Sequence, residues 1–343
     1  MPNMSAKLPP NMLLKYIFSR VGSRDPSVIV GPSIGEDAAI IDIGGGRVLA
    51  VHADPITGAV EHIGWLSVHI ACNDIAVRGA RPKWLVPVIL LPQSAGDKLV
   101  DEISRQMDEA ANEVGAMIVG GHTEFTLGLS RPIISVTAIG VADKSRIVVT
   151  SGARVGDAVI MTKTVGVEGT AILSTDFRDV LRGLGVSEDV LKRGREFIKK
   201  VSIVKEALAL AEAGLATSMH DPTEGGLVGG LAEIAYASRK TIEIWEDRVP
   251  IAAETRIIAS ALKIDPLKLI GSGSLVATIP EDRVSKAIEI LRALGVEATV
   301  IGRVLDASDS YVVIHKRGGG IEKVTDVYIR DEIYTVWERL QGK

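Results

Sequence analysis

Carboxylates stand beside glycines and at strand ends in the first half of this chain. Gly31 and Gly35 precede Glu36 and Asp37, and glycine permits the sharp backbone turn that would place two carboxylates at the start of a strand. Asp54 ends an apolar, strand-like run, at a position where ligands commonly meet a sheet. Oxygen ligands of this kind suit a hard cation such as Mg²⁺. Taken alone, the glycine-rich stretch with Glu36 and Asp37 fits an acidic surface turn equally well. Asp54 alone is more typical of an aspartate in a turn or at a helix cap.

A polar pair lies inside a helix-like segment. Asn73 and Asp74 fall within the range 62–77, whose apolar residues recur at helical spacing. Polar side chains inside an apolar helix are costly unless they are hydrogen-bonded or bind a ligand. We expect the pair either to form a hydrogen-bond network in the core or to turn its carboxylate toward a cation, and we favour the cation.

A glycine pair follows a short strand-like run. Gly120 and Gly121 come directly before His122 and Thr123, and successive backbone amides in such a turn can form a concave anion site. A lone histidine is more often structural than a ligand. The motif as a whole predicts backbone contacts to phosphate oxygens.

A second glycine pair stands at the start of a helix-like segment. Asp221 or Thr223 can cap the helix expected at 223–237, whose first amides point outward and can bind an anion. Gly225 and Gly226 would keep this approach open, because glycines in a first helical turn are costly without a reason. The alternative is ordinary capping with tight packing around the glycines.

Familiar phosphate-binding motifs are missing from the sequence. It has no Gly-Lys-Ser or Gly-Lys-Thr loop and no Gly-x-Gly-x-x-Gly turn between a strand and a helix. Its serines show no nucleophile elbow. If phosphate is bound, a cation held by carboxylates together with backbone amides must bind it.

Composition narrows the possible classes of protein. The 343 residues contain 39 Lys plus Arg against 43 Asp plus Glu, with no basic stripe, so we expect no nucleic-acid partner. Cys72 is the single cysteine, which excludes an intrachain disulfide. The segment 1–7 does not resemble a signal peptide and no run is long enough to cross a membrane, which predicts a cytoplasmic protein. Abundant Ile, Val, Arg and Glu with scarce Asn and Gln hint at a thermophilic source.

The elements that must position these residues alternate between strand and helix in both halves. This alternation predicts two α+β units with mixed sheets. Because polar, turn-rich stretches separate the halves, we expect an N-terminal domain at 1–146 and a C-terminal α/β domain at 147–343. Expected strands cover 38–43, 48–53, 116–119, 132–141, 157–162, 274–279 and 298–304, and expected helices cover 62–77, 97–114, 168–174, 202–213, 223–237 and 282–294.

Two further segments carry specific expectations. The apolar run 84–91 predicts a buried strand, and Pro87 within it favours an edge position or a bulge because proline cannot donate to a ladder. The charged range 176–194 is expected to be an exposed, irregular insertion.

Taken in order, the motifs resemble the superfamily of aminoimidazole ribonucleotide synthetase (PurM). This superfamily includes the hydrogenase maturation factor HypE, thiamine monophosphate kinase and selenophosphate synthetase. The resemblance extends from about residue 26 to residue 304. It rests on Gly35–Ala39, Asp54, Asn73-Asp74 with Gly79–Pro82, Gly120–Thr123 and Asp221–Gly226.

The resemblance implies a PurM-like two-domain fold, whose N-terminal domain dimerises through its sheet. It also implies ATP in the cleft between the domains, near the partner subunit. By this likeness Asp37, Asp54 and Asp74 bind Mg²⁺ and phosphates and act as the catalytic residues. The other implied nucleotide-binding residues are Gly31, Gly35, Glu36, Asn73, Gly120, Gly121, His122, Thr123, Asp221, Thr223, Gly225 and Gly226.

Departures from the superfamily motifs limit what reaction can be expected. The motifs look most similar to the HypE type, but the sequence ends without the cysteine that carries the HypE thiocarboxamide. Glu36 and His122 stand where thiamine monophosphate kinases prefer aspartate. We expect a magnesium-dependent ATP-binding protein that activates a substrate oxygen by phosphorylation. The alternatives are an accessory protein in metallocofactor maturation, a small-molecule kinase or a paralogue that has lost nucleotide binding. The sequence does not identify the substrate.

Overall fold

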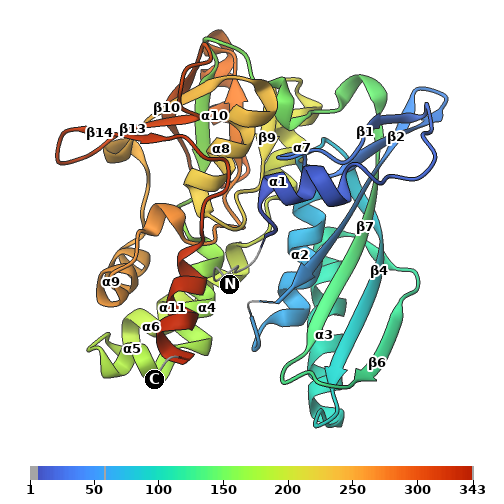
Figure 1. The fold of residues 1–343 in the computed structure, drawn as a ribbon, viewed down its shortest axis with the longest axis vertical. Helices are drawn as coiled ribbons and strands as arrows, with labels where there is room; N and C mark the ends of the chain where they lie inside the picture. The colour runs from blue at the N-terminus through green and yellow to red at the C-terminus, as the bar shows by residue number, and fades with distance from the viewer. Residues whose placement is uncertain (1–6, 58, 342–343) are drawn as a thin grey trace.

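The computed structural model describes residues 7–57 and 59–341. The segments 1–6 and 342–343, which bear on the expectations about a signal peptide and a terminal cysteine, lie outside it. Two units, each built on one sheet, lie side by side (Figure 1). This is the expected α+β arrangement in two units. In the described part of the chain, no helix has the length and apolar character needed to cross a membrane.

The first unit holds a mixed sheet whose seven strands lie within the described residues, in the order β1-β2-β3-β7-β4-β5, with β6 also paired to β4. Parallel pairing joins β4 to β5 and β6, and antiparallel pairing joins β4 to β7. The strands are β1 Val28–Val30, β2 Ala39–Gly44, β3 Arg47–Ile56, β4 Arg81–Pro92, β5 Met117–Ile118, β6 His122–Thr126 and β7 Ile133–Asp143. The helices are α1 Pro10–Met12, α2 Ile63–Ala76 and α3 Asp97–Val114.

The second unit holds another sheet, whose seven described strands follow the order β14-β13-β10-β12-β8-β11-β9. Its strands are β8 Ala158–Thr162, β9 Ser218–His220, β10 Thr241–Trp245, β11 Val276–Ile279, β12 Ala298–Leu305, β13 Val312–His315 and β14 Ile321–Val324. Its helices are α4 Val167–Asp176, α5 Arg178–Gly183, α6 Glu188–Arg195, α7 Val204–Glu212, α8 Gly226–Ser238, α9 Ala253–Leu262, α10 Val284–Ala293 and α11 Glu332–Gln341.

Helix α2 joins the two units. It packs on β3, β4 and β7 of the first sheet, against α3, and against α7 of the second unit. Its side chains are buried almost all round, including Asn73 and Asp74, so this helix has no solvent face. A helix that is apolar and buried on all sides belongs to the core. The polar residues of α2 lie at the boundary between the two units.

Strand β4 differs from expectation in position and burial. It is an interior strand, with β7 on one side and β5 and β6 on the other. On this side of β4, Pro87 falls between the residues paired with β5 and those paired with β6. Its missing amide hydrogen therefore interrupts no hydrogen bonding to either strand. The irregularity in register lies between Pro82 and Trp84. The strand is also only half-buried, since Trp84 is 39% exposed.

Three other segments differ from expectation. The range 176–194 is helical, with α5 and α6 joined by a short turn, and the α6 cap is Ser187, whose hydroxyl accepts from the Val190 amide. Helix α8 begins at Gly226, three residues later than expected, because Gly225 adopts a left-handed conformation that precludes an earlier start. Residues 122–123 belong to strand β6 and not to a loop.

Candidate functional site

The three expected catalytic aspartates line one cavity at the boundary between the two units. The cavity has a volume of about 350 Å³. Asp37 lies just before β2, Asp54 lies near the end of β3, and Asp74 lies in the last turn of α2. Gly35, Glu36 and Thr223 also line it, and their place in the cavity agrees with the sequence expectation.

One side of the cavity presents three side chains that could hold a cation. His52, Asp54 and Asp74 each present a ligand atom within 4.8 Å of the others. His52 Nε2 lies 3.4 Å from Asp74 Oδ2. Burial, and next Glu224, raise the pKa of Asp54 to about 7. Burial, and next Asp54, raise the pKa of Asp74 well above its ordinary value. A cation between these groups would relieve the cost of two buried like charges.

The other side of the cavity is held by an arginine. Arg78 is fully buried and donates to Glu36 Oε2 at 2.6 Å, to Asp37 Oδ2 at 2.9 Å and to the Met219 carbonyl at 2.5 Å. The other oxygen of Glu36 accepts from the backbone amide and hydroxyl of Ser151. Glu36 therefore binds protein groups from both units, and its expected contact with a nucleotide stays a prediction.

A buried histidine completes this side. His220 Nδ1 lies 2.5 Å from Asp37 Oδ1, and its Nε2 lies 2.8 Å from Glu233 Oε2. Burial opposes the charged imidazolium, but Asp37 and Glu233 outweigh burial and raise the pKa of His220 to about 10. Both Asp37 oxygens thus face cationic partners, which leaves this carboxylate less available to a metal ion than Asp54 or Asp74.

A lysine from the N-terminal segment enters the same cavity. Lys7 Nζ lies 3.3 Å from Thr223 Oγ1, 3.4 Å from Glu233 Oε1 and 3.5 Å from Glu224 Oε2. Its side chain remains 42% exposed. Burial of the amine opposes its charge, whereas Glu233 and Glu224 raise the pKa of Lys7 above its ordinary value. This ammonium therefore lies in the wall of the acidic cavity and is partly open to solvent.

Asn73 and Asp221 form a polar joint between the units. Asn73 Nδ2 donates to Asp221 Oδ2 at 2.9 Å and to the Val201 carbonyl at 2.8 Å, while its oxygen accepts from the Ile203 amide. Asn73 thus belongs to a hydrogen-bond network in the core, which is one of the two alternatives that the sequence left open for the pair Asn73-Asp74. Burial raises the pKa of Asp221 to about 7.

The second glycine pair is packed against backbone. A Cβ at Gly225 would lie 2.8 Å from the Ile329 carbonyl oxygen, and one at Gly226 would lie 2.5 Å from the Leu269 carbonyl oxygen. The Gly225 amide donates to Asp331 Oδ2 at 2.8 Å. These glycines do not line the acidic cavity, so the tight-packing alternative explains them.

The first glycine pair lies away from the cavity within one chain. Neither Gly120, Gly121, His122 nor Thr123 lines it. His122 Nε2 pairs instead with Glu124 Oε2 at 3.1 Å on the exposed strand β6. Gly31 also does not line the acidic cavity and borders a neighbouring one. The expected nest over the phosphates is therefore not assembled by a single chain.

Sequence reasoning gave no site role to five further residues: Lys7, His52, His220 and Glu233 line the cavity, and Arg78 binds two of its carboxylates, Glu36 and Asp37. His52 had a detectable signal, because it precedes Asp54 by two residues on a strand and so shares its face. The other four come from segments far apart in sequence, and only their packing brings them together.

These features define a class: a two-domain α+β protein with an acidic, cation-suited cavity at the domain boundary. The family AIR synthase related protein matches this chain in two parts, the N-terminal domain over residues 35–142 and the C-terminal domain over residues 154–315. The chain belongs to the AIR synthase related (PurM-like) family.

Relatives within this family include proteins named for hydrogenase expression or maturation. A hydrogenase expression/formation protein of Methanocaldococcus jannaschii is 30% identical over 277 residues, 78% of each chain. The carbamoyl dehydratase HypE of Rhizobium leguminosarum bv. viciae is 31% identical over 298 residues, 83% of this chain and 82% of its own. A crystal structure of hydrogenase maturation protein HypE in complex with ATP superposes with a TM-score of 0.71 at 27% identity, covering 88% of this chain and 92% of the other.

Proposed function

We propose that the chain binds ATP as its magnesium complex in the acidic cavity and uses it to phosphorylate an oxygen of a substrate. The convergence of Asp37, Asp54 and Asp74 on one cavity carries the proposal. The related HypE structure that contains ATP supports it. The sequence has none of the familiar phosphate-binding loops, so a cation held by carboxylates is the chemistry that we assign to this cavity.

The donor set fits a divalent cation. Asp54 and Asp74 supply oxygen ligands, and His52 supplies a nitrogen within the same 4.8 Å. We assign the cation to this side of the cavity, and we assign Asp37 to positioning because Arg78 and His220 already hold it. When bound, the metal would neutralise phosphate charge and polarise the transferred phosphoryl group.

The chain's own groups would do the rest. Lys7 places an ammonium at the cavity, where it can contact phosphate oxygens once it leaves Glu224 and Glu233. Arg78 and His220 keep Glu36 and Asp37 fixed, so the loop before β2 is rigid when nucleotide arrives. Catalysis of phosphoryl transfer depends chiefly on such positioning and electrostatics.

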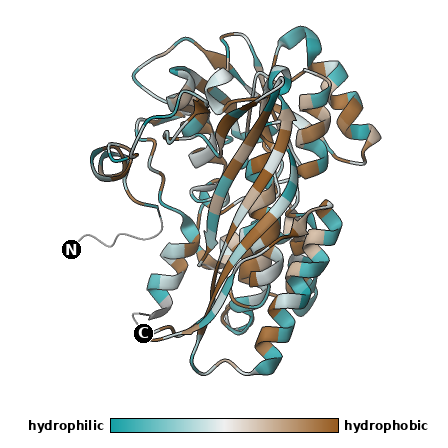
Figure 2. Ribbon diagram, turned by 90° about the vertical axis from the view of Figure 1, so that its right-hand side faces the viewer, coloured by the Kyte–Doolittle hydropathy of each residue, from teal (hydrophilic) through white to brown (hydrophobic). Residues whose placement is uncertain are grey.

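We also propose a homodimer formed through the open face of the first sheet. Large apolar side chains are exposed on or beside β4, β5 and β6: Met117 at 67%, Phe125 at 60%, Leu127 at 78% and Val119 at 50%. Figure 2 shows hydrophobic stretches on these strands with no helix drawn in front of them. Such a face favours burial against a second copy, and Gly120–Thr123 would then lie at the subunit contact.

The first experiment measures nucleotide binding and turnover with the purified full chain. Mg-ATP at about 100 times its Kd should add about 2.7 kcal/mol to the free energy of unfolding. Asp54→Asn should lose most of this gain and any phosphate release. Asp143→Asn, on an exposed aspartate paired with Arg47, is the matched control and should keep both. An unchanged gain in Asp54→Asn would contradict the assignment.

An accessory role in hydrogenase maturation is the second candidate, and the names of the related proteins favour it. In that case the chain would bind Mg-ATP without releasing phosphate alone. Phosphate release assayed with and without a co-purifying maturation protein separates the two candidates. Rapid release with a small metabolite and no protein partner would exclude the accessory role.

A further inference from the structure

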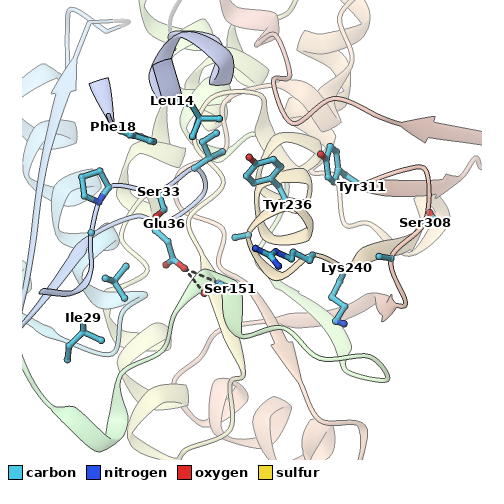
Figure 3. A pocket seen from close by; sticks show the side chains of 17 residues that line it. Leu14, Phe18, Ile29, Ser33, Glu36, Ser151, Tyr236, Lys240, Ser308 and Tyr311 are labelled. Atoms are coloured by element: carbon cyan, nitrogen blue, oxygen red, sulfur yellow. Dashed lines mark hydrogen bonds between the residues drawn. The ribbon is translucent and has the colours of Figure 1, made fainter. Parts of the chain in front are cut away.

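A second cavity lies beside the acidic one, on the other side of the loop 31–36. Its volume is about 720 Å³, roughly twice that of the acidic cavity. Figure 3 shows Leu14, Phe18 and Ile29 from the first unit on one side and Tyr236 and Tyr311 on the other. A volume of this order suits a small organic ligand.

Apolar and aromatic side chains form one part of the wall of this cavity. Tyr236 near the end of α8 and Tyr311 before β13 contact each other edge to face, with ring centroids 5.7 Å apart. Leu14 and Phe18 face them from the N-terminal segment (Figure 3). Aromatic rings of this kind offer a flat apolar surface together with a polar hydroxyl. The walls therefore suit a ligand with a flat apolar body.

Two cations line the same cavity. Arg239 and Lys240 directly follow α8, and within the described ranges neither side chain has a hydrogen-bond or ion-pair partner. The one carboxylate among the lining residues, Glu36, is already held by Arg78 at 2.6 Å and by Ser151. The cavity thus has an excess of positive charge, which favours an anion.

We propose that this second cavity binds a small organic anion with an apolar, aromatic body and a carboxylate or phosphate head group. Arg239 and Lys240 would bind the head group, and the aromatic walls would enclose the body. A nucleotide base extending from the acidic cavity is the competing occupant. Two unpaired cations disfavour it, because a base carries no charge for them to neutralise.

The two cavities share one wall. Phe18, Ser33, Ile34 and Glu36 line both of them. Glu36 also binds the Thr150 amide at 3.0 Å, so it links this loop to the second unit. A ligand in the second cavity would therefore contact the loop that carries Asp37, although it would occupy a separate space.

The test uses 1-anilinonaphthalene-8-sulfonate, an aromatic anion whose fluorescence rises on binding, with the full chain. We expect one saturable site per chain. The double variant R239Q/K240Q should weaken binding about tenfold or more, because charge-assisted contacts to the head group are lost. Lys263→Gln is the matched control and should change nothing. Like Arg239, Lys263 ends a helix in a left-handed conformation, and it lies outside the cavity.

A second variant tests the walls. Ala237→Trp places a large ring on a residue that lines the cavity and should abolish probe binding. Circular dichroism and the melting temperature check that the variant is folded. Displacement of the probe by 1-naphthyl phosphate or by 1-naphthoate then distinguishes the two head groups, since these compounds share one ring system.

Two outcomes would overturn the proposal. One is a probe affinity that R239Q/K240Q and Ala237→Trp leave unchanged. The other is simple competition between the probe and saturating Mg-ATP, which would make this cavity part of the nucleotide site. Mg-ATP binding is followed separately by thermal shift in the absence of probe. A failure of the proposed ATP function therefore leaves the probe experiment interpretable.

Discussion

The two sides of the acidic cavity hold their carboxylates differently. On one side, Glu36 and Asp37 are bound by the fully buried Arg78, and Asp37 also faces His220. On the other side, Asp54 and Asp74 lie within 4.8 Å of each other and of His52, the charge of Lys7 acts on them without a direct ion pair among the described residues, and burial raises the pKa of both carboxyls. The sequence had assigned all four carboxylates to one magnesium and nucleotide site.

We infer that this difference separates carboxylates with a structural role from carboxylates that bind a ligand. A buried carboxylate with a cationic partner is stable in the free protein, whereas two buried carboxylates without one repel each other until a cation or a proton arrives. We infer that the first side fixes the geometry and that the second side keeps its binding capacity. The following variants test this comparison.

The largest effect is expected from removing the arginine. Arg78→Met leaves Glu36 and Asp37 buried without their main cation and should lower the free energy of unfolding by about 3–5 kcal/mol. Urea denaturation measures it. Arg81→Met, on an arginine 59% exposed and paired with Glu212, is the control and should cost no more than about 1 kcal/mol. Equal effects in the two variants would refute the structural role of Arg78.

The next effect concerns Asp37 on the same side. Asp37→Asn removes the charge that faces Arg78 and His220 and should destabilise the metal-free protein by about 2–3 kcal/mol. It should also return the His220 pKa toward its ordinary value, which NMR titration of the imidazole can follow. If Asp37 served only as a metal ligand, this variant would be as stable as wild type in EDTA.

Asp221, which binds Asn73 between the two units, is expected to make the free energy of unfolding depend on pH. Burial raises its pKa from 3.8 to about 7, so its contribution to stability is full below pH 4 and is lost as pH rises through 7. The stability of Asp221→Asn relative to wild type should therefore improve by about 1–2 kcal/mol between pH 5 and pH 8 in EDTA. Denaturation curves at both pH values measure it, and a constant difference would contradict the raised pKa.

On the other side of the cavity, removing a carboxylate charge is expected to leave the metal-free protein as stable as before or to stabilise it. Asp74→Asn relieves repulsion with Asp54, so in EDTA the variant should be as stable as wild type or more stable by up to about 1 kcal/mol. With Mg-ATP the order should reverse, because the variant has lost a ligand. Calorimetric scans under the two conditions test this. Loss of stability in EDTA comparable to that of Asp37→Asn would remove the contrast between the sides.

The smallest effect on magnesium is expected from the histidine. His52→Ala should change the Mg²⁺ affinity less than about threefold, because Mg²⁺ prefers oxygen ligands. It should weaken Mn²⁺ or Co²⁺ binding more, since imidazole suits these metals better. Metal titrations followed by melting temperature compare them. Equal losses for all three metals would show that His52 only positions Asp74.

Local patterns predicted some elements closely. Helix α3 begins at Asp97 and ends at Val114 as expected, because its amphipathic pattern and the left-handed Gly115 lie within the segment itself. Strand β6 and the late start of α8 were not predicted. Strand β6 forms by pairing with β4, and the position of Gly226 is fixed by the backbone of Leu269. Such contacts have no local signature.

The sequence by itself determined the two α+β units and the family, and its motifs pointed to Asp37, Asp54 and Asp74 as one cluster. It did so because turn glycines, strand periods and helix caps act over a few residues. Only the tertiary structure decided which of these carboxylates are already paired. Arg78 reaches the Met219 carbonyl across 141 positions, and Lys7 reaches Glu233 across 226. Pairing at such separations depends on how the units pack, and no local pattern of residues records it.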